Sequence, residues 1–156
     1  MVTESQRYFT VDEVNELLPD AINTFHTLVQ VRLQILQIQS ELARYGVEEE
    51  TVDFECIAPL MRGRVRSLLS TLDVLVGAFR SQAEILEATG CQIKDMDPPL
   101  ADWPTLHEGR EVLLCWRYGE KEIGYWHEID AGFAGRRPVS ELRSDSASPS
   151  PETKDQ

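Results

Sequence analysis

Two long segments repeat apolar residues at helical spacing, and this repetition limits the possible folds more than any other feature. In the first segment, residues 20–45, the seam positions recur every seven residues in two registers, as the a and d positions of a coiled coil do. The two registers are Ala21, Leu28, Ile35 and Leu42, and Thr24, Val31, Ile38 and Tyr45. A second stripe, Ile22, Val29, Leu36 and Ala43, runs beside them. The apolar arc is therefore wider than a two-stranded coil requires.

The second segment, residues 65–86, has a narrower seam with steps of three and four residues. Its members are Val65, Leu68, Leu72, Leu75, Phe79, Gln82 and Leu86. A connection of about a dozen residues, 47–58, is long enough for the two helices to pack antiparallel. The wide arc of the first helix then needs a further contact, either with the C-terminal part of the chain or with a second chain.

The start of the first helix is strongly specified. Thr10 and Glu13 fit a capping box, and Phe9 and Val14 occupy the positions of a hydrophobic staple. Pro19 falls inside the helix, where it removes an amide donor and clashes with the preceding turn. We therefore expect a kink or a short break at Pro19.

From residue 91 the pattern changes to short extended pieces. Pro98, Pro99 and Pro104 break any helix, and short extended pieces are expected at 91–94 and 100–103. Segments 112–118 and 122–129 are rich in aromatic and branched residues around Gly119, which predicts a β-hairpin. The expected fold class is α+β, with a long antiparallel helical hairpin and a small antiparallel β module. We expect one domain over 7–142, with the helical hairpin in 8–90 and the β module in 91–139. A disordered tail should follow over 143–156.

The faces of the predicted β-hairpin follow from its loop length. With an even-numbered loop, Cys115 and His127 point to opposite faces, and Arg117 can pair with Glu128. The more apolar face then contains Val112, Leu114, Trp116, Tyr118, Ile123, Tyr125, His127 and Ile129. This arrangement argues against a metal shared by Cys115 and His127, so no metal and no cofactor are expected. A three-residue loop would change the register and remove that objection.

The net charge limits the kinds of partner that the protein can bind, and the cysteines indicate its cellular compartment. The net charge is −12, from 27 acids and 15 bases, which disfavours nucleic acid as the main partner. The three cysteines are widely separated, so neither a disulfide framework nor a zinc ribbon is indicated. The sequence shows no signal peptide at its start and no apolar run long enough for a membrane span. We expect a cytoplasmic protein with reduced thiols and no membrane partner.

Several motifs near the two ends of the chain resemble one family. They are RYFTV from Arg7, LLP from Leu17, GREV from Gly109, LCWR from Leu114, WHE from Trp126 and GFAGR from Gly132. The chain resembles the prokaryotic family catalogued as domain of unknown function 2203, over about residues 7–139. The resemblance implies a small soluble bacterial or archaeal protein and implies no activity.

The glycine- and arginine-rich loop near residue 135 is the main candidate for ligand binding. Its amides can form an anion nest, and its arginines can hold a phosphate or carboxylate. The candidate ligand-binding residues are Gly132, Gly135, Arg136, Arg137, Trp126, His127 and Glu128. The alternative is a tight turn that packs on the rest of the fold, with Arg136 paired to an acid. His127 is likewise either a core histidine bonded to a carbonyl or a ligand contact.

Three functions remain open, and no catalytic residue is assigned. The favoured one is a non-enzymatic interaction or scaffold module that self-associates through its helices as a homodimer. The second is a small-ligand or anion-binding protein that uses the loop at 132–137. The third is a metal-assisted enzyme using Asp102, His107, His127 and Glu128, although His107 and His26 are expected to be exposed.

Overall fold

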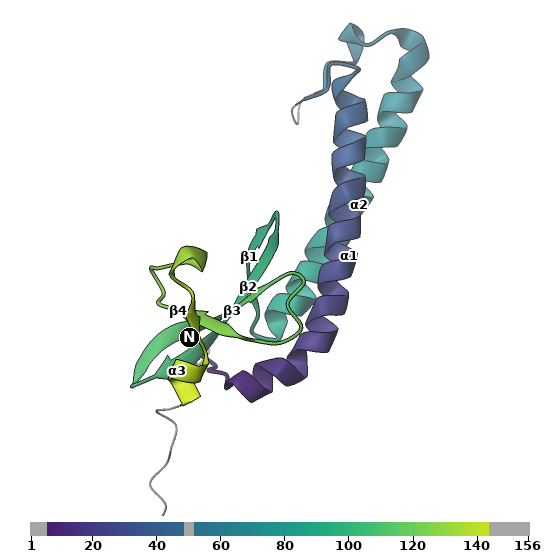
Figure 1. Cartoon of the computed structure of the whole chain (residues 1–156). Coiled ribbons are helices and arrows are strands. Elements are labelled where there is room, and N and C mark those ends of the chain that lie inside the picture. Colours follow the sequence, from purple (N-terminus) through teal and green to yellow (C-terminus); the bar gives the residue numbers. More distant parts are fainter. Residues whose placement is uncertain (1–5, 49–51, 144–156) are drawn as a thin grey trace, which may run out of the picture. The chain divides into compact units, whose positions relative to one another are not determined.

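The computed structural model describes residues 6–48 and 52–143, which form two compact units (Figure 1). One unit contains the chain up to Asp20 together with the chain from Gly90 onward, and the other is Ala21–Thr89. The first unit carries an antiparallel sheet and the second carries a pair of helices, so the predicted α+β class is confirmed. Most of the predicted tail, from residue 144 on, lies outside the described residues.

Helix α1, Val11–Ala43, begins where the capping signals predict. The amide of Glu13 donates to Thr10 Oγ1 at 3.1 Å, and both staple residues, Phe9 and Val14, are buried. The helix has 33 residues and is about 50 Å long. It runs through Pro19 without interruption, so the short break does not occur, and the kink at Pro19 stays a prediction.

The unit Ala21–Thr89 is a helical hairpin, in which α1 and α2, Arg62–Ala88, run side by side (Figure 1). Two short 3-10 turns, η1 at Phe54–Cys56 and η2 at Pro59–Met61, precede α2. The end of the hairpin holds a cluster of buried apolar side chains, Leu42, Ile57, Val65 and Leu68. No helix among the described residues has both the length and the apolar composition needed to cross a membrane.

The other unit contains a five-stranded antiparallel meander in the order β1-β2-β3-β4-β5. The strands are β1 Gln92–Met96, β2 Pro99–His107, β3 Arg110–Arg117, β4 Tyr125–His127 and β5 Arg137–Pro138. A 3-10 turn, η3 at Phe133–Gly135, and a short helix, α3 at Ser140–Arg143, flank β5. The predicted hairpin is β3-β4, but its second strand is shorter than the expected 122–129.

A proline inside β2 shows how the start of the chain joins the sheet. Pro104 lies beyond the last β1–β2 pair, which is Gln92 with Asp102. The amide hydrogen that proline lacks is therefore not needed for a hydrogen bond between β1 and β2. Its carbonyl accepts the Phe9 amide at 2.8 Å. This bond ties the residues before α1 to the edge of β2.

One face of the sheet forms the core of this unit. Its side chains alternate along the strands, and four of the largest, Trp103, Leu114, Trp116 and Trp126, are at most 1 % exposed. Phe9, just before α1, and Val14 and Leu18 near the start of α1 are at most 2 % exposed. The opposite face carries Asp102, Cys115 and His127.

The β3–β4 register differs from the predicted one. Leu113 pairs with His127 and Cys115 with Tyr125, and the connection covers residues 118–124, an odd number. Cys115 and His127 therefore share a face, and the prediction that they point to opposite sides is wrong. The cause lies in the loop, because Ile123 donates its amide to Asn15 Oδ1 at 2.8 Å and is thereby kept out of the strand pairing.

Candidate functional site

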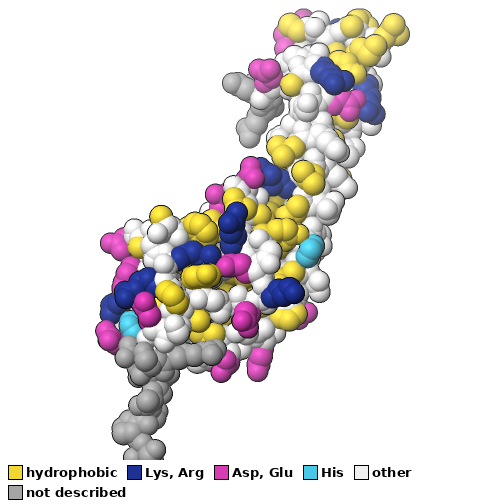
Figure 2. Space-filling model, viewed as in Figure 1, with side chains coloured by type: hydrophobic (Ala, Val, Ile, Leu, Met, Phe, Trp, Pro, Cys, Tyr) yellow, Lys and Arg dark blue, Asp and Glu magenta, His cyan; other side chains and the backbone are white. Residues whose placement is uncertain are grey.

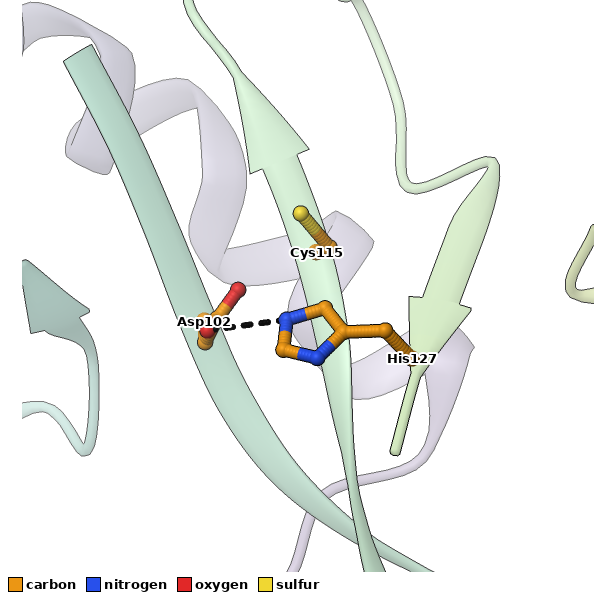
Figure 3. A group of neighbouring side chains, drawn as sticks. All are labelled: Asp102, Cys115 and His127. Atoms are coloured by element: carbon orange, nitrogen blue, oxygen red, sulfur yellow. Dashed lines mark hydrogen bonds and ion pairs between the residues drawn. The ribbon is translucent and has the colours of Figure 1, made fainter. Parts of the chain in front are cut away.

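Three polar side chains from three neighbouring strands converge on the face opposite the core (Figure 3). Asp102 on β2 lies directly opposite Cys115 on β3, and His127 on β4 reaches across β3 toward Asp102. Their relative exposures are 3 %, 2 % and 3 %. One potential ligand atom of each residue lies within 4.8 Å of the other two. A buried group of this kind is costly unless its polar atoms are satisfied.

The hydrogen bonds of His127 define its tautomer. Nδ1 lies 2.7 Å from the Glu128 carbonyl oxygen, which can only accept, so Nδ1 carries a hydrogen. Nε2 lies 3.1 Å from Asp102 Oδ2. In a neutral imidazole Nε2 then has a lone pair that faces a carboxylate oxygen. Two acceptors at this distance need a cation between them, either a proton or a metal ion.

Cys115 completes the group as a protonated thiol. Its pKa is raised to about 12, mainly by burial and also by the Asp102 carboxylate, while the Arg136 guanidinium opposes both. The two nitrogens of His127 face oxygen atoms, Nδ1 the Glu128 carbonyl and Nε2 the Asp102 carboxylate. His127 Nε2 is directed at Asp102 Oδ2 and not at the Cys115 thiol, so the geometry does not support a cysteine–histidine nucleophile.

The donor set suits a divalent transition metal. Cysteine sulfur, imidazole nitrogen and carboxylate oxygen are all zinc ligands, and bond lengths of about 2.0–2.3 Å place tetrahedral ligand atoms roughly 3.2–3.8 Å apart. The Asp102–His127 pair is already at 3.1 Å, and the widest separation in the group is no more than 4.8 Å. A bound hydrogen-bond acceptor on Nδ1 is also typical of metal-ligating histidines, because it fixes the ring and its tautomer.

A pocket of about 180 Å³ opens beside the group. Asp102 and His127 line it, whereas Cys115 does not. The remaining lining residues are Lys94, Leu100, Leu113, Ile129, Gly132 and Phe133. A tetrahedral ion held by the three side chains would therefore direct its fourth position toward the pocket.

The glycine- and arginine-rich loop packs next to the same face. Arg136 donates to the Cys115 carbonyl at 3.2 Å and pairs with Glu120 at 2.5 Å. Its guanidinium also lies over the rings of Tyr125 and Phe133, 4.1 and 4.7 Å from their centroids. Burial lowers the pKa of Arg136, but the hydrogen bonds and charge interactions with Glu120 and Cys115 together outweigh it, so the net shift is upward. Arg136 thus has internal partners that match the alternative of a packed turn.

The other predicted ligand-binding residues are dispersed. Trp126 is buried on the core face, where Arg137 lies over its ring at 4.9 Å and His107 lies 5.2 Å away. Gly132 lines the pocket, and Gly135 ends the 3-10 turn. The structure therefore brings His127 and Gly132 to the pocket and leaves Trp126 and Arg137 on the other side of the sheet.

Two local predictions are wrong. Glu128 pairs with Arg110 at 2.5 Å and not with Arg117, whose guanidinium lies over Phe133, 5.8 Å from the centroid. His107 is 9 % exposed and not on the surface, because its position on β2 places it on the core face beside Trp126. His26 is exposed as expected.

Sequence reasoning missed the pairing of Asp102 with Cys115 and His127. The signal was Asp102, the single acidic residue of the mostly buried strand β2, together with Cys115 in the mostly buried strand β3. The pocket residues Lys94, Leu100, Ile129 and Phe133 were also missed, because they come from separate elements.

The chain was compared with known proteins at the level of families, curated sequences and solved structures. No curated protein and no solved structure gives a significant match. The model of one family, described as an uncharacterized conserved protein, matches residues 7–139, which is most of the chain. The chain therefore belongs to the family of uncharacterized conserved proteins DUF2203.

Proposed function

We propose that this protein binds one divalent transition metal ion, with Asp102, Cys115 and His127 as its ligands. The observation that carries the proposal is the convergence of three different metal-ligating side chains, all buried, on one face of the sheet. Zinc is the ion that a mixed sulfur, nitrogen and oxygen set accommodates most readily.

A purely structural role for the three residues explains less of the geometry. A buried histidine–aspartate pair could satisfy itself with a proton, but that pair would not need a cysteine sulfur beside it. A divalent ion would replace the thiol proton and bridge Nε2 to the carboxylate, so all three side chains would gain partners. The metal also gives a function to the open pocket, because three protein ligands leave one position for another molecule.

The test measures zinc in the purified full-length protein. The protein is prepared without an affinity tag that binds metal, stripped with chelator, reloaded with zinc and desalted. We expect about one zinc per chain by elemental analysis. Cys115→Ala, His127→Gln and Asp102→Asn should each lose most of this zinc, because each removes one of three ligands.

The chain supplies matched controls. Cys91→Ala removes a second buried cysteine, and Cys56→Ala removes an exposed one that lies 3.2 Å from Asp53. Both variants should retain the zinc of the unsubstituted protein. Equal zinc in Cys115→Ala and Cys91→Ala would contradict the proposal, as would a protein that holds no zinc after reloading.

Self-association through the helical hairpin is a second proposal. Its support is the lack of any fully buried residue in α1 between Leu28 and Leu42, and in α2 between Leu68 and Leu86. Leu33 and Leu36 are 47 % and 43 % exposed, and hydrophobic side chains reach the surface along the hairpin (Figure 2). A second hairpin would cover this surface and complete a four-helix bundle.

Sedimentation equilibrium tests this second proposal. The full-length protein should sediment as a dimer, and a Leu33→Gln/Leu36→Gln double variant should shift toward monomer. Leu60→Gln is the control, because Leu60 is 93 % exposed and lies before α2, outside the seam. A monomer at every concentration in the unsubstituted protein would refute the dimer.

We further propose that the protein works in a reducing compartment such as the cytoplasm. None of the three cysteines, Cys56, Cys91 and Cys115, forms a disulfide. A reduced Cys115 is also what metal binding requires, since the thiolate is the ligand.

A further inference from the structure

The pocket beside the three ligands has a mixed lining that suggests the class of its ligand. Its walls are mostly apolar, from Leu100, Leu113, Ile129 and Phe133. Ile129 and Phe133 are 55 % and 41 % exposed, so part of each side chain is open to solvent. Each leaves apolar surface that a bound molecule could bury, which favours a ligand with an apolar body.

The size of the pocket limits that apolar body. Its volume is about 180 Å³, and a cavity of roughly 150 Å³ is known to hold benzene. The enclosed part of a ligand should therefore have about six non-hydrogen atoms. A nucleotide or a peptide is too large to be enclosed in it.

The charges around the pocket favour an anionic head group. Lys94 is exposed at the pocket and forms no ion pair with an acid among the described residues. A divalent ion held by one carboxylate, one thiolate and a neutral imidazole has no net charge to repel an anion. Its fourth position and the Lys94 ammonium group would then both attract a carboxylate oxygen.

We infer that the pocket binds a small aliphatic carboxylate, whose head group occupies the open position of the metal beside Lys94 and whose chain lies against Phe133 and Ile129. This inference rests on the proposed metal site. Gly132, in the loop before Phe133, is consistent with this inference. Its φ of 61° with an extended ψ is a conformation that glycine alone adopts readily. That turn brings Phe133 to the wall of the pocket.

Isothermal titration calorimetry on the zinc-loaded, desalted full-length protein tests the inference with acetate, propionate, butyrate and hexanoate. Affinity should rise about fourfold for each added methylene up to butyrate, as expected for burial of a CH₂ group. It should then level off when the pocket is full. Butylammonium and 1-butanol have the same number of carbon atoms but no carboxylate, and they should bind at least tenfold more weakly.

Two variants locate the binding site. Lys94→Gln should weaken butyrate about tenfold while zinc stoichiometry stays unchanged, because it removes one charge-assisted hydrogen bond. Lys121→Gln is the matched control on an exposed lysine that does not line the pocket, and it should have no effect. Phe133→Ala should reduce the gain in affinity with chain length.

The possible results of these experiments distinguish a failure of the carboxylate inference from a failure of the proposed metal site. Stoichiometric zinc with no binding of any carboxylate would overturn the inference and leave the metal site standing. Equal butyrate affinity with and without zinc would also overturn it, because the head group would not be on the metal. Equal affinity for butyrate and butylammonium would rule out an anionic head group.

Discussion

At the scale of single residues, the Glu128 carbonyl decides what His127 can do. By accepting the Nδ1 hydrogen at 2.7 Å, it leaves Nε2 with a lone pair that faces Asp102. The same ring with the other tautomer would donate to Asp102 and need no further partner. The contact between Nδ1 and the Glu128 carbonyl thus decides between two states. In one, His127 and Asp102 form a complete hydrogen-bonded pair, and in the other they leave a place for a cation between them.

Gly90 is the residue at which backbone conformation matters most. Its φ is 100°, and a β-carbon built there would collide with the Phe9 ring. We expect Gly90→Ala to lower the free energy of unfolding by about 2–4 kcal/mol, from the positive φ and the overpacking together. Urea unfolding measures the loss.

Gly77→Ala is the control for Gly90→Ala. Gly77 lies inside α2 with open space around it, so alanine should stabilise the helix by about 0.5–1 kcal/mol. A Gly90→Ala protein as stable as the unsubstituted one would show that the close packing of Phe9 on Gly90 does not exist.

Asp53 and Cys56 form a pair whose behaviour with pH can be measured. Hydrogen bonds from the Cys56 thiol and the Glu55 amide hold the pKa of Asp53 below its ordinary value. A lowered pKa in the folded state stabilises the protein above the ordinary aspartate pKa, and this stabilisation is lost as the pH falls through the lowered value. Because the pair is exposed, the effect on stability should be small.

Nuclear magnetic resonance titration of the Asp53 carboxyl carbon checks this shift. In the unsubstituted protein the midpoint should lie below that of an ordinary aspartate, and in Cys56→Ala it should move upward. An unchanged midpoint in Cys56→Ala would show that the thiol does not donate to Asp53.

At the scale of elements, the start of α1 was predictable from four residues. The Thr10 side chain caps the helix, and its loss removes the acceptor for the Glu13 amide. We expect Thr10→Ala to reduce the free energy of unfolding by about 1 kcal/mol. Thr27→Ala, inside the same helix and exposed, should have little effect or stabilise slightly, since alanine is the better helix former. Equal losses in the two variants, measured by urea unfolding, would contradict a capping role.

The β3–β4 connection marks the limit of prediction at this scale. Alternation within β3 was predictable, because Val112, Leu114 and Trp116 are apolar at every second position. The pairing with β4 was not, because it depends on a hydrogen bond from Ile123 to Asn15, which is 108 positions away in the sequence. A shift of one residue moved His127 to the face of Cys115 and so changed which site could exist.

At the scale of the whole molecule, the chain separates its two proposed roles into two units. The sheet unit holds the three proposed metal ligands and the pocket, and the helical unit holds the apolar seam. Helix and sheet content followed from the periodicity of the sequence. The site did not, since it combines single residues from β2, β3 and β4 that only the three-dimensional pairing brings together.

X-ray absorption at the zinc edge of the loaded full-length protein tests the metal site most directly. One sulfur ligand at about 2.3 Å and nitrogen or oxygen ligands at about 2.0–2.1 Å are predicted, and the sulfur should be absent in any zinc that Cys115→Ala retains. A first shell made only of nitrogen and oxygen in the unsubstituted protein, or a sulfur that persists in Cys115→Ala, would contradict a metal held by Asp102, Cys115 and His127.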